Sequence, residues 1–143
     1  MSALDKGEKL IEFDILFQEL VRDSSCQLKG LLNDLVTPTQ FYLLKLIATH
    51  DNCKAADIAH ILDISPAAAT TILDRLYKNG WIERARSDKD RRIVWLKVTE
   101  DGKKLLSDIE AKRFQLLVKQ FDNITEGEIE NICEVFKKIL NMA

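Results

Sequence analysis

Residues 55–102 read AADIAHILDISPAAATTILDRLYKNGWIERARSDKDRRIVWLKVTEDG, and signals for a helix, a turn, a second helix and a hairpin follow one another there. The second helix has the clearest boundaries. Ser65 can accept a hydrogen bond from a free backbone N–H as the N-cap, Pro66 suits the first helical position, and Gly80 supplies a C-terminal stop. These signals predict a helix over residues 66–79.

The predicted helix has an apolar stripe and an outward face. The stripe recurs at spacings of three and four, and it consists of Ala69, Ile72, Leu73 and Leu76. The outward face is small near the start and charged near the end, and it consists of Ala67, Ala68, Thr70, Thr71, Asp74, Arg75 and Lys78. Small residues allow close approach to a surface, and the first residues of a recognition helix meet base edges in the major groove of DNA. An ordinary surface helix has the same pattern, so this helix alone does not decide the function.

Two β-prone runs follow the helix. WIERAR at 81–86 and IVWLKV at 93–98 are rich in β-branched and aromatic residues with partial alternation, and the charged residues SDKDRR lie between them. The pair predicts a hairpin with an exposed tip that carries Lys89, Arg91 and Arg92. Such a tip can touch phosphates or enter a minor groove. The whole stretch predicts a winged helix-turn-helix, a mainly α fold with a small β-hairpin wing and a helical dimerisation layer around it.

Basic residues are concentrated in this stretch. Residues 73–97 contain eight Lys and Arg against four Asp and Glu, a net charge of +4, whereas the rest of the chain is −6 and the whole chain −2. The mildly acidic isoelectric point of 5.7 therefore does not argue against nucleic-acid binding, because the positive charge is local.

The sequence here resembles the MarR family of bacterial transcriptional regulators. The resemblance lies in four elements in order: IAHILDIS, ILDRLYKNGWIER, the wing DRR, and LKVTEDG. The D-x-R wing signature of the family, followed by a threonine and a glycine, falls on Asp90, Arg92, Thr99 and Gly102. The match is sharp over about residues 55–102, and outside it only the helical layout agrees.

The resemblance implies a homodimer that binds a pseudo-palindromic site in double-stranded DNA, usually as a repressor. The residues expected at the DNA are Ser65, Pro66, Ala67, Ala68, Thr70, Thr71, Arg75, Lys78, Arg86, Lys89, Asp90, Arg91 and Arg92. Threonine and serine hydroxyls can reach phosphates or base edges, and threonine and alanine methyls suit thymine methyls. The signature makes Asp90 the orienting partner of Arg92, while Lys78 and Arg86 are looser phosphate candidates.

Many members of the family release DNA when a small aromatic ligand enters the cleft between the dimer layer and the winged helix. In this chain the candidate lining residues are Phe13, Phe17, Tyr42 and Leu46. Apolar residues at helical spacing are more often plain core. The resemblance therefore implies a small aromatic effector as a further partner, without identifying it.

Composition narrows the alternatives. The chain has 143 residues, 46% of them apolar and 31% charged, and no run reaches the ~18 apolar residues of a membrane span. The N-terminus lacks the pattern of a secretory signal, so we expect a cytoplasmic location and no membrane contact. Without a G-x-G-x-x-G, P-loop or H-E-x-x-H motif, we expect no enzyme and no cofactor. A winged-helix protein-interaction module is the alternative, but such a module does not need arginines at the hairpin tip.

Helices are predicted on both sides of the winged stretch. Apolar spacing predicts a long helix over about residues 6–35, interrupted around 23–25. Thr37-Pro38-Thr39-Gln40 is a capping box, and the helix it starts should bury Phe41, Leu44, Ile47 and Ala48. Asp63 should tolerate the turn geometry before the recognition helix.

Toward the C-terminus, Thr99 should cap a helix that runs to about residue 121, and residues 125–128 form a second capping box. We treat residues 1–143 as a single MarR-like unit. Residues 36–99 are its winged DNA-binding part, and residues 1–35 and 100–143 are its dimerisation part.

Three cysteines, Cys26, Cys53 and Cys133, lack a C-x-x-C pair, so we expect reduced and mostly buried thiols. In the family's best-known redox switch the cysteine lies early in the first helix, and Cys26 lies later than that. His50, Cys53 and His60 are the only cluster that hints at a metal. Their spacings match no recognised ligand pair, so we assign no metal ligand.

Overall fold

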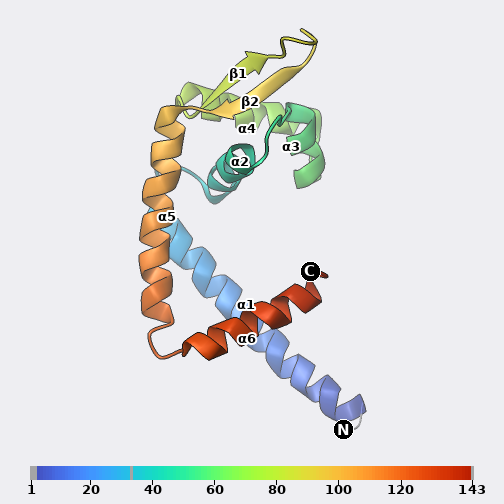
Figure 1. Ribbon diagram of the computed structural model, residues 1–143, viewed down its shortest axis with the longest axis vertical. Helices are drawn as coiled ribbons and strands as arrows, with labels where there is room; N and C mark the ends of the chain where they lie inside the picture. The colour runs from blue at the N-terminus through green and yellow to red at the C-terminus, as the bar shows by residue number, and fades with distance from the viewer. Residues whose placement is uncertain (1–2, 33, 143) are drawn as a thin grey trace. The chain divides into compact units, whose positions relative to one another are not determined.

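A computed structural model describes residues 3–32 and 34–142, which form six helices and one two-stranded antiparallel sheet (Figure 1). The elements are α1 Ala3–Leu32, α2 Pro38–Thr49, α3 Ala55–Leu62, α4 Pro66–Lys78, β1 Ile82–Arg86, β2 Val94–Val98, α5 Glu100–Gln120 and α6 Glu126–Ile139. The predicted mainly α fold with a hairpin wing is confirmed. Within these residues, no helix is both long and apolar enough to cross a membrane.

Two compact units divide the chain, residues 1–109 and residues 110–143. The first unit contains the winged helix and one continuous core. Its largest fully buried side chains are Leu43, Leu44, Ile58 and Leu76, which come from α2, α3 and α4. The hairpin adds Ile82, Leu96 and Val98 to this core. The predicted division at residues 35/36 and 99/100 stays a prediction.

The capping boxes position two helices as the sequence predicts. At the start of α2, the Thr37 hydroxyl accepts from the Gln40 N–H at 3.1 Å, and the Gln40 side chain accepts from the Thr37 N–H at 3.0 Å. Thr125 and Glu128 pair in the same way at the start of α6. The prediction that Ala48 is buried is wrong, because it is exposed on the last turn of α2, beyond the core.

The predicted interruption of the first helix is also wrong. α1 is continuous through Asp23 and its two following serines, and it ends at Leu32 instead of residue 35. These polar residues are exposed, where poor helix propensity costs only a few tenths of a kcal/mol per residue. The Gln27 amide donates to the Asp23 carboxylate at 3.3 Å, one turn away, which supports the helix at this point. Asp34, with a φ of 61°, turns the chain after α1.

The wing is an antiparallel hairpin with a defined register. Ile82 pairs with Val98, Arg84 with Leu96 and Arg86 with Val94, so alternate residues of β1 share one face. A third segment joins its edge, because the Leu96 N–H donates to the Cys53 carbonyl at 2.8 Å. The loop after α2 is thereby bonded directly to β2.

A corner made by Thr99 joins α4, the hairpin and α5. The Thr99 hydroxyl donates to the Gly80 carbonyl at 2.6 Å and accepts from the Gly102 N–H at 3.1 Å, which confirms it as the cap of α5. The Thr99 N–H donates to the Trp81 carbonyl at 3.0 Å. A Cβ added at Gly102 would lie 2.3 Å from the Trp81 oxygen and 2.6 Å from Val98 Cγ1. Only glycine fits this close approach of two backbones.

Candidate nucleic-acid interface

The turn between α3 and α4 has the geometry that the sequence predicts. Asp63 adopts a left-handed conformation, with φ of 52° and ψ of 50°, and its N–H donates to the His60 carbonyl at 3.2 Å. The Ile64 N–H donates to the Ala59 carbonyl at 3.0 Å, which closes α3. Aspartate tolerates this conformation because its short polar side chain can bond locally. Two residues separate Asp63 from the start of α4.

The first turn of α4 is open to solvent. The Ser65 hydroxyl accepts from the Ala68 N–H at 3.1 Å, and Pro66 occupies the first helical position. Ser65, Pro66 and Ala67 are exposed, while Ala68 is half-buried. A helix N-terminus with small exposed side chains carries partial positive charge and leaves room for another backbone. The approach of this part of α4 to DNA stays a prediction.

Two threonines follow one turn later, and their hydroxyl hydrogens are engaged within the helix. Thr70 Oγ1 donates to the Pro66 carbonyl at 2.9 Å, and Thr71 Oγ1 donates to the Ala67 carbonyl at 3.0 Å. Both side chains are exposed. Because these donors are used within the helix, contacts of the hydroxyls with phosphates or base edges stay a prediction. The hydroxyl oxygens keep acceptor capacity, and the methyls remain available for apolar contact.

The C-terminal end of α4 contacts β1 through Arg84, a residue that the sequence analysis did not name among the DNA contacts. The Arg84 guanidinium lies 4.2 Å from the centroid of the Tyr77 ring, and its Nη2 donates to the Asp74 carboxylate at 3.3 Å. Arg75 and Lys78 belong to the same end of α4. Arg84 could have been recognised from the sequence, because the period-two pattern of β1 places it on the same face as buried Ile82.

The wing tip is shaped by its own hydrogen bonds. Arg86 Nη1 donates to the Arg91 carbonyl at 2.9 Å, and the Ser87 N–H donates to the Ile93 carbonyl at 3.0 Å. The Lys89 N–H donates to the Ser87 hydroxyl at 3.3 Å. Arg86, which is predicted as a loose phosphate contact, stabilises the wing tip through this hydrogen bond. Lys89 and Arg91 are exposed.

Asp90 and Arg92 form a two-pronged ion pair at this tip. Arg92 Nε donates to Asp90 Oδ1 and Arg92 Nη2 to Asp90 Oδ2, each at 3.1 Å, and the Arg92 N–H donates to Oδ1 at 3.0 Å. The Arg92 side chain is 91% exposed and that of Asp90 34%. The hydrogen bonds from Arg92 lower the pKa of Asp90, and the carboxylate raises the pKa of Arg92. The pair holds the Arg92 guanidinium in one direction at the surface.

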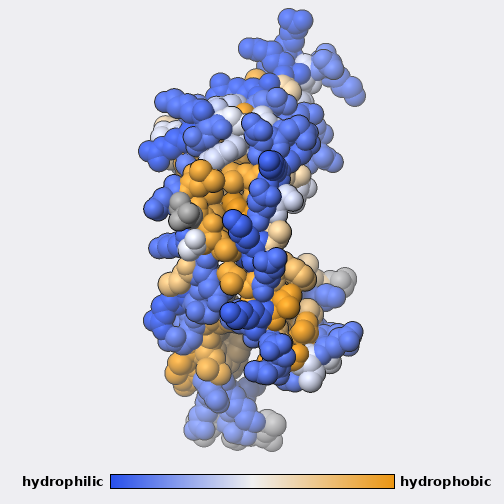
Figure 2. Space-filling view, turned by 90° about the vertical axis from the view of Figure 1, so that its left-hand side faces the viewer, coloured by the Kyte–Doolittle hydropathy of each residue, from blue (hydrophilic) through white to orange (hydrophobic). Residues whose placement is uncertain are grey.

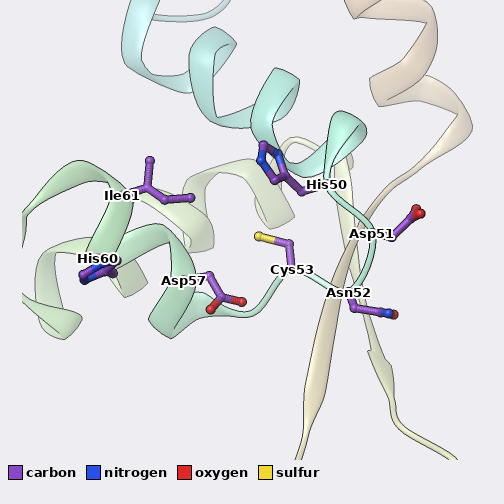
Figure 3. A pocket seen from close by; sticks show the side chains of 7 residues that line it. All are labelled: His50, Asp51, Asn52, Cys53, Asp57, His60 and Ile61. Atoms are coloured by element: carbon purple, nitrogen blue, oxygen red, sulfur yellow. The ribbon is translucent and has the colours of Figure 1, made fainter. Parts of the chain in front are cut away.

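Beside the loop that follows α2 lies a pocket of about 240 Å³ lined by both histidines of the chain (Figure 3). Figure 3 shows the Cys53 sulfur on the side of the His50 ring, whereas Asp51 and Asn52 point away. Burial, and secondly the charge of Asp57, raise the pKa of the Cys53 thiol, which keeps it protonated. In the part of the chain that the structure describes, no three His, Cys, Asp or Glu side chains are placed to hold a metal ion.

The other two cysteines differ from the sequence prediction. Cys26 on α1 and Cys133 on α6 are exposed in the single chain, so the expectation of mostly buried thiols is wrong for them. Both lie on helices whose apolar residues also face outward. Of the three, Cys53 alone is buried.

The residues predicted to line an effector cleft are not enclosed in the single chain. Phe13 and Phe17 stack on each other on α1, with ring centroids 5.6 Å apart, but they remain 45% and 41% exposed. Tyr42 is 48% exposed, and Leu46 is half-buried against the core. Whether these four form a ligand site stays a prediction.

Comparisons with known proteins identify the family of the chain. The model of the MarR family matches residues 36–94. The multiple antibiotic resistance protein MarR of Salmonella typhimurium is 32% identical over 106 residues, which are 73% of this chain and 74% of that protein. The chain belongs to the MarR family. Another relative, the HTH-type transcriptional repressor MdtR of Bacillus subtilis, is 26% identical over 133 residues, 93% of this chain and 84% of that protein.

Solved structures agree on the fold of this MarR-family chain. A MarR family protein from Bacillus stearothermophilus superposes with a TM-score of 0.85 at 18% identity and covers 94% of this chain and 95% of its own. A mutant of S. aureus MepR bound to an oligodeoxyribonucleotide gives a TM-score of 0.68 at 21% identity, covering 90% of this chain and 96% of its own. The chain is a winged-helix transcriptional regulator and not an enzyme.

Proposed function

We propose that this MarR-family chain is a repressor that binds a pseudo-palindromic site in double-stranded DNA as a homodimer. A two-fold dimer presents two recognition helices, which predicts half-sites about one helical turn apart, ~10 to 10.5 bp from centre to centre. The observation that carries the proposal is the Asp90–Arg92 pair, a preoriented cation at the wing tip. The relatives named as repressors, and the DNA-bound relative, support it.

In the proposed complex, the first turns of α4 enter the major groove. Ser65, Pro66, Ala67 and Ala68 let the helix approach closely, because their side chains are small and mostly exposed. The methyls of Thr70 and Thr71 contact thymine methyls, since the hydroxyl hydrogens are bonded to the helix. Arg75 reaches a base edge or phosphate from the following turn.

The wing supplies the second contact. Arg92 enters the minor groove, which is narrow and strongly negative over A-tracts, and thereby favours A·T-rich flanks. Because Asp90 already holds the guanidinium in place, less ordering is needed when DNA binds. Lys89 and Arg91 contact phosphates.

Apolar side chains at the surface support the dimer (Figure 2). In the first unit most of them lie on α1, among them Leu10, Ile11, Phe13, Leu16, Phe17 and Leu20. In the second unit they lie on the end of α5 and on α6: Phe114, Leu117, Val118, Ile129, Ile132, Val135, Phe136 and Ile139. α6 has no buried residue in the single chain, although one of its faces is apolar. A second copy that covers these faces would bury roughly 2,000 Å² or more.

Sedimentation tests the dimer. We expect a dimer at micromolar concentration, whereas a stable monomer would contradict this part of the proposal.

An aromatic effector site would need completion by the second copy, because Phe13, Phe17 and Tyr42 are open in the single chain. Adding small phenolic compounds to the protein–DNA complex tests for release.

Two single variants test the DNA-binding mode. Arg92→Ala should weaken specific binding by roughly 1 to 3 kcal/mol and reduce the preference for A·T-rich flanks. Lys89→Ala should weaken binding to all sequences alike and reduce the salt slope by about one unit. Titrating both variants against operators with A·T-rich and G·C-rich flanks separates the two roles. Equal losses on every sequence would show that Arg92 is only another phosphate contact, and a wild-type chain that binds no duplex would exclude the proposed function.

A further inference from the structure

A second basic site lies at the C-terminal end of α4, beyond the first turns of the helix and apart from the wing tip. A pocket of about 430 Å³ opens there between α4 and β1, lined by Asp74, Tyr77, Lys78 and Arg84. Two cations face one carboxylate, so the lining carries a net charge of +1. Lys78 takes part in no ion pair with another described residue.

Arg84 is already held in this pocket. Its guanidinium lies over the Tyr77 ring at 4.2 Å, and one of its nitrogens bonds to Asp74 at 3.3 Å. A guanidinium has five N–H donors in a fixed plane, so the remaining donors stay available to a second oxygen ligand. Arg84 thus has the preorganisation that lowers the ordering cost of binding.

The pocket continues the outward face of the recognition helix. Ala67, Thr71, Asp74 and Lys78 follow one another at spacings of three and four along α4, and therefore lie in one row. The 13 residues of α4 span ~20 Å at 1.5 Å per residue, whereas a major groove is about 12 Å wide. In the proposed complex α4 enters the groove by its N-terminus, so its last turn lies outside the base edges, at the level of the phosphates.

We propose that this pocket binds one phosphate of the DNA backbone at the edge of the major groove, with Arg84 and Lys78 as its two cationic contacts. The inference rests on the proposed DNA-binding function and adds a contact that fixes how far α4 enters the groove. Asp74 makes the pocket poor for a free dianion, because the carboxylate repels it. A backbone phosphate is instead held there by the other contacts of the same duplex.

The salt dependence of binding tests the inference. Each neutralised phosphate contributes ~0.9 to the slope of log K against log salt, and the pocket neutralises one phosphate, so Lys78→Gln combined with Arg84→Gln should reduce the slope by ~0.9 for each half-site. Between 50 and 200 mM salt, the wild-type affinity should then fall roughly 3.5-fold more per half-site than the affinity of the double variant. The loss should be the same on cognate and random duplexes, because a phosphate carries no sequence information. Lys119→Gln, which removes an exposed charge from the C-terminal unit, is the control and should leave the slope unchanged.

Neutral methylphosphonate replacements in the operator locate the contact. One replacement at the groove edge should weaken wild-type binding but leave binding by the variant with both Lys78→Gln and Arg84→Gln unaffected. Arg84→Lys, which keeps the charge, should retain most of the slope, and a thermal melt checks that each variant is folded. An unchanged slope in the folded double variant, with wing variants still impaired, would overturn this inference alone. Absence of wild-type DNA binding would instead exclude the proposed function.

Discussion

Gly102→Ala should destabilise the first unit, residues 1–109, because the added methyl group would clash where the backbones of residues 81 and 102 approach each other. The new Cβ would lie 2.3 Å from the Trp81 carbonyl oxygen and 2.6 Å from Val98 Cγ1. The first of these atoms belongs to the backbone and cannot rotate away, so α5 and the segment before β1 must separate. Inserting a methyl group into such a packed site costs roughly 1 to 3 kcal/mol.

Separation also strains the hydrogen bond from the Thr99 N–H to the Trp81 oxygen, 3.0 Å long, whose loss costs about 0.5 to 1.5 kcal/mol. Alanine gains up to ~1 kcal/mol over glycine in a helix, which offsets part of the loss. We therefore expect a net loss of about 2 kcal/mol in the free energy of unfolding. With a urea m-value of about 2 kcal/mol/M, the midpoint should fall by about 1 M.

Urea unfolding at one fixed protein concentration measures this loss, since the stability of a dimer depends on concentration. Gly127→Ala is the matched control, because Gly127 also lies in the first turn of a helix and nothing lies within 4 Å of its added Cβ. That variant should be neutral or slightly stabilised. Equal midpoints for the two variants would refute the argument from close approach.

Three further outcomes follow from the local geometry. Ser65→Ala removes the side-chain cap of α4 and should lower the free energy of unfolding in urea by about 1 kcal/mol. An unchanged free energy of unfolding would mean that solvent alone can cap the helix. The pKa of Asp90 is lowered by Arg92, so the pair is complete above the ordinary pKa of aspartate and is lost only as pH falls through the lowered value. Arg92-dependent DNA binding should therefore be flat from about pH 6 to 8, and an NMR titration of the Asp90 carboxyl that ends above its ordinary range would contradict this. Burial and Asp57 raise the pKa of the Cys53 thiol, so iodoacetamide should alkylate Cys53 only after unfolding. Peptide mass mapping measures this labelling, and rapid labelling of Cys53 in the folded chain would contradict its burial.

The features that the sequence predicts well are those encoded within a few residues. Capping at Thr37, Ser65 and Thr125 each needs only the next three positions, and all three caps occur. The pairing of Asp90 with Arg92 is equally local, since the partners lie two positions apart along the tip. For such features, the short range leaves few competing arrangements.

The predictions that failed depend either on a contact between distant segments or on a weak local preference. Arg84 meets Asp74 ten residues away, and the pattern of charges alone did not choose that carboxylate. The interruption predicted in α1 failed because propensity is a weak preference that a long helix overrides. The hydroxyls of Thr70 and Thr71 turned toward carbonyls of their own helix, a choice of rotamer that residue identity does not reveal.

The corner at Thr99 has a consequence for the operator. It bonds the end of α4, the root of the wing and the start of α5 to one another, so the recognition helix and the hairpin cannot shift separately. In the proposed complex, the number of base pairs between the bases read by α4 and the flank touched by Arg92 is therefore constant. The distance within each half-site is therefore fixed, and one inserted base pair there would prevent α4 and Arg92 from making their contacts at the same time. The distance between half-sites can change only if whole subunits move.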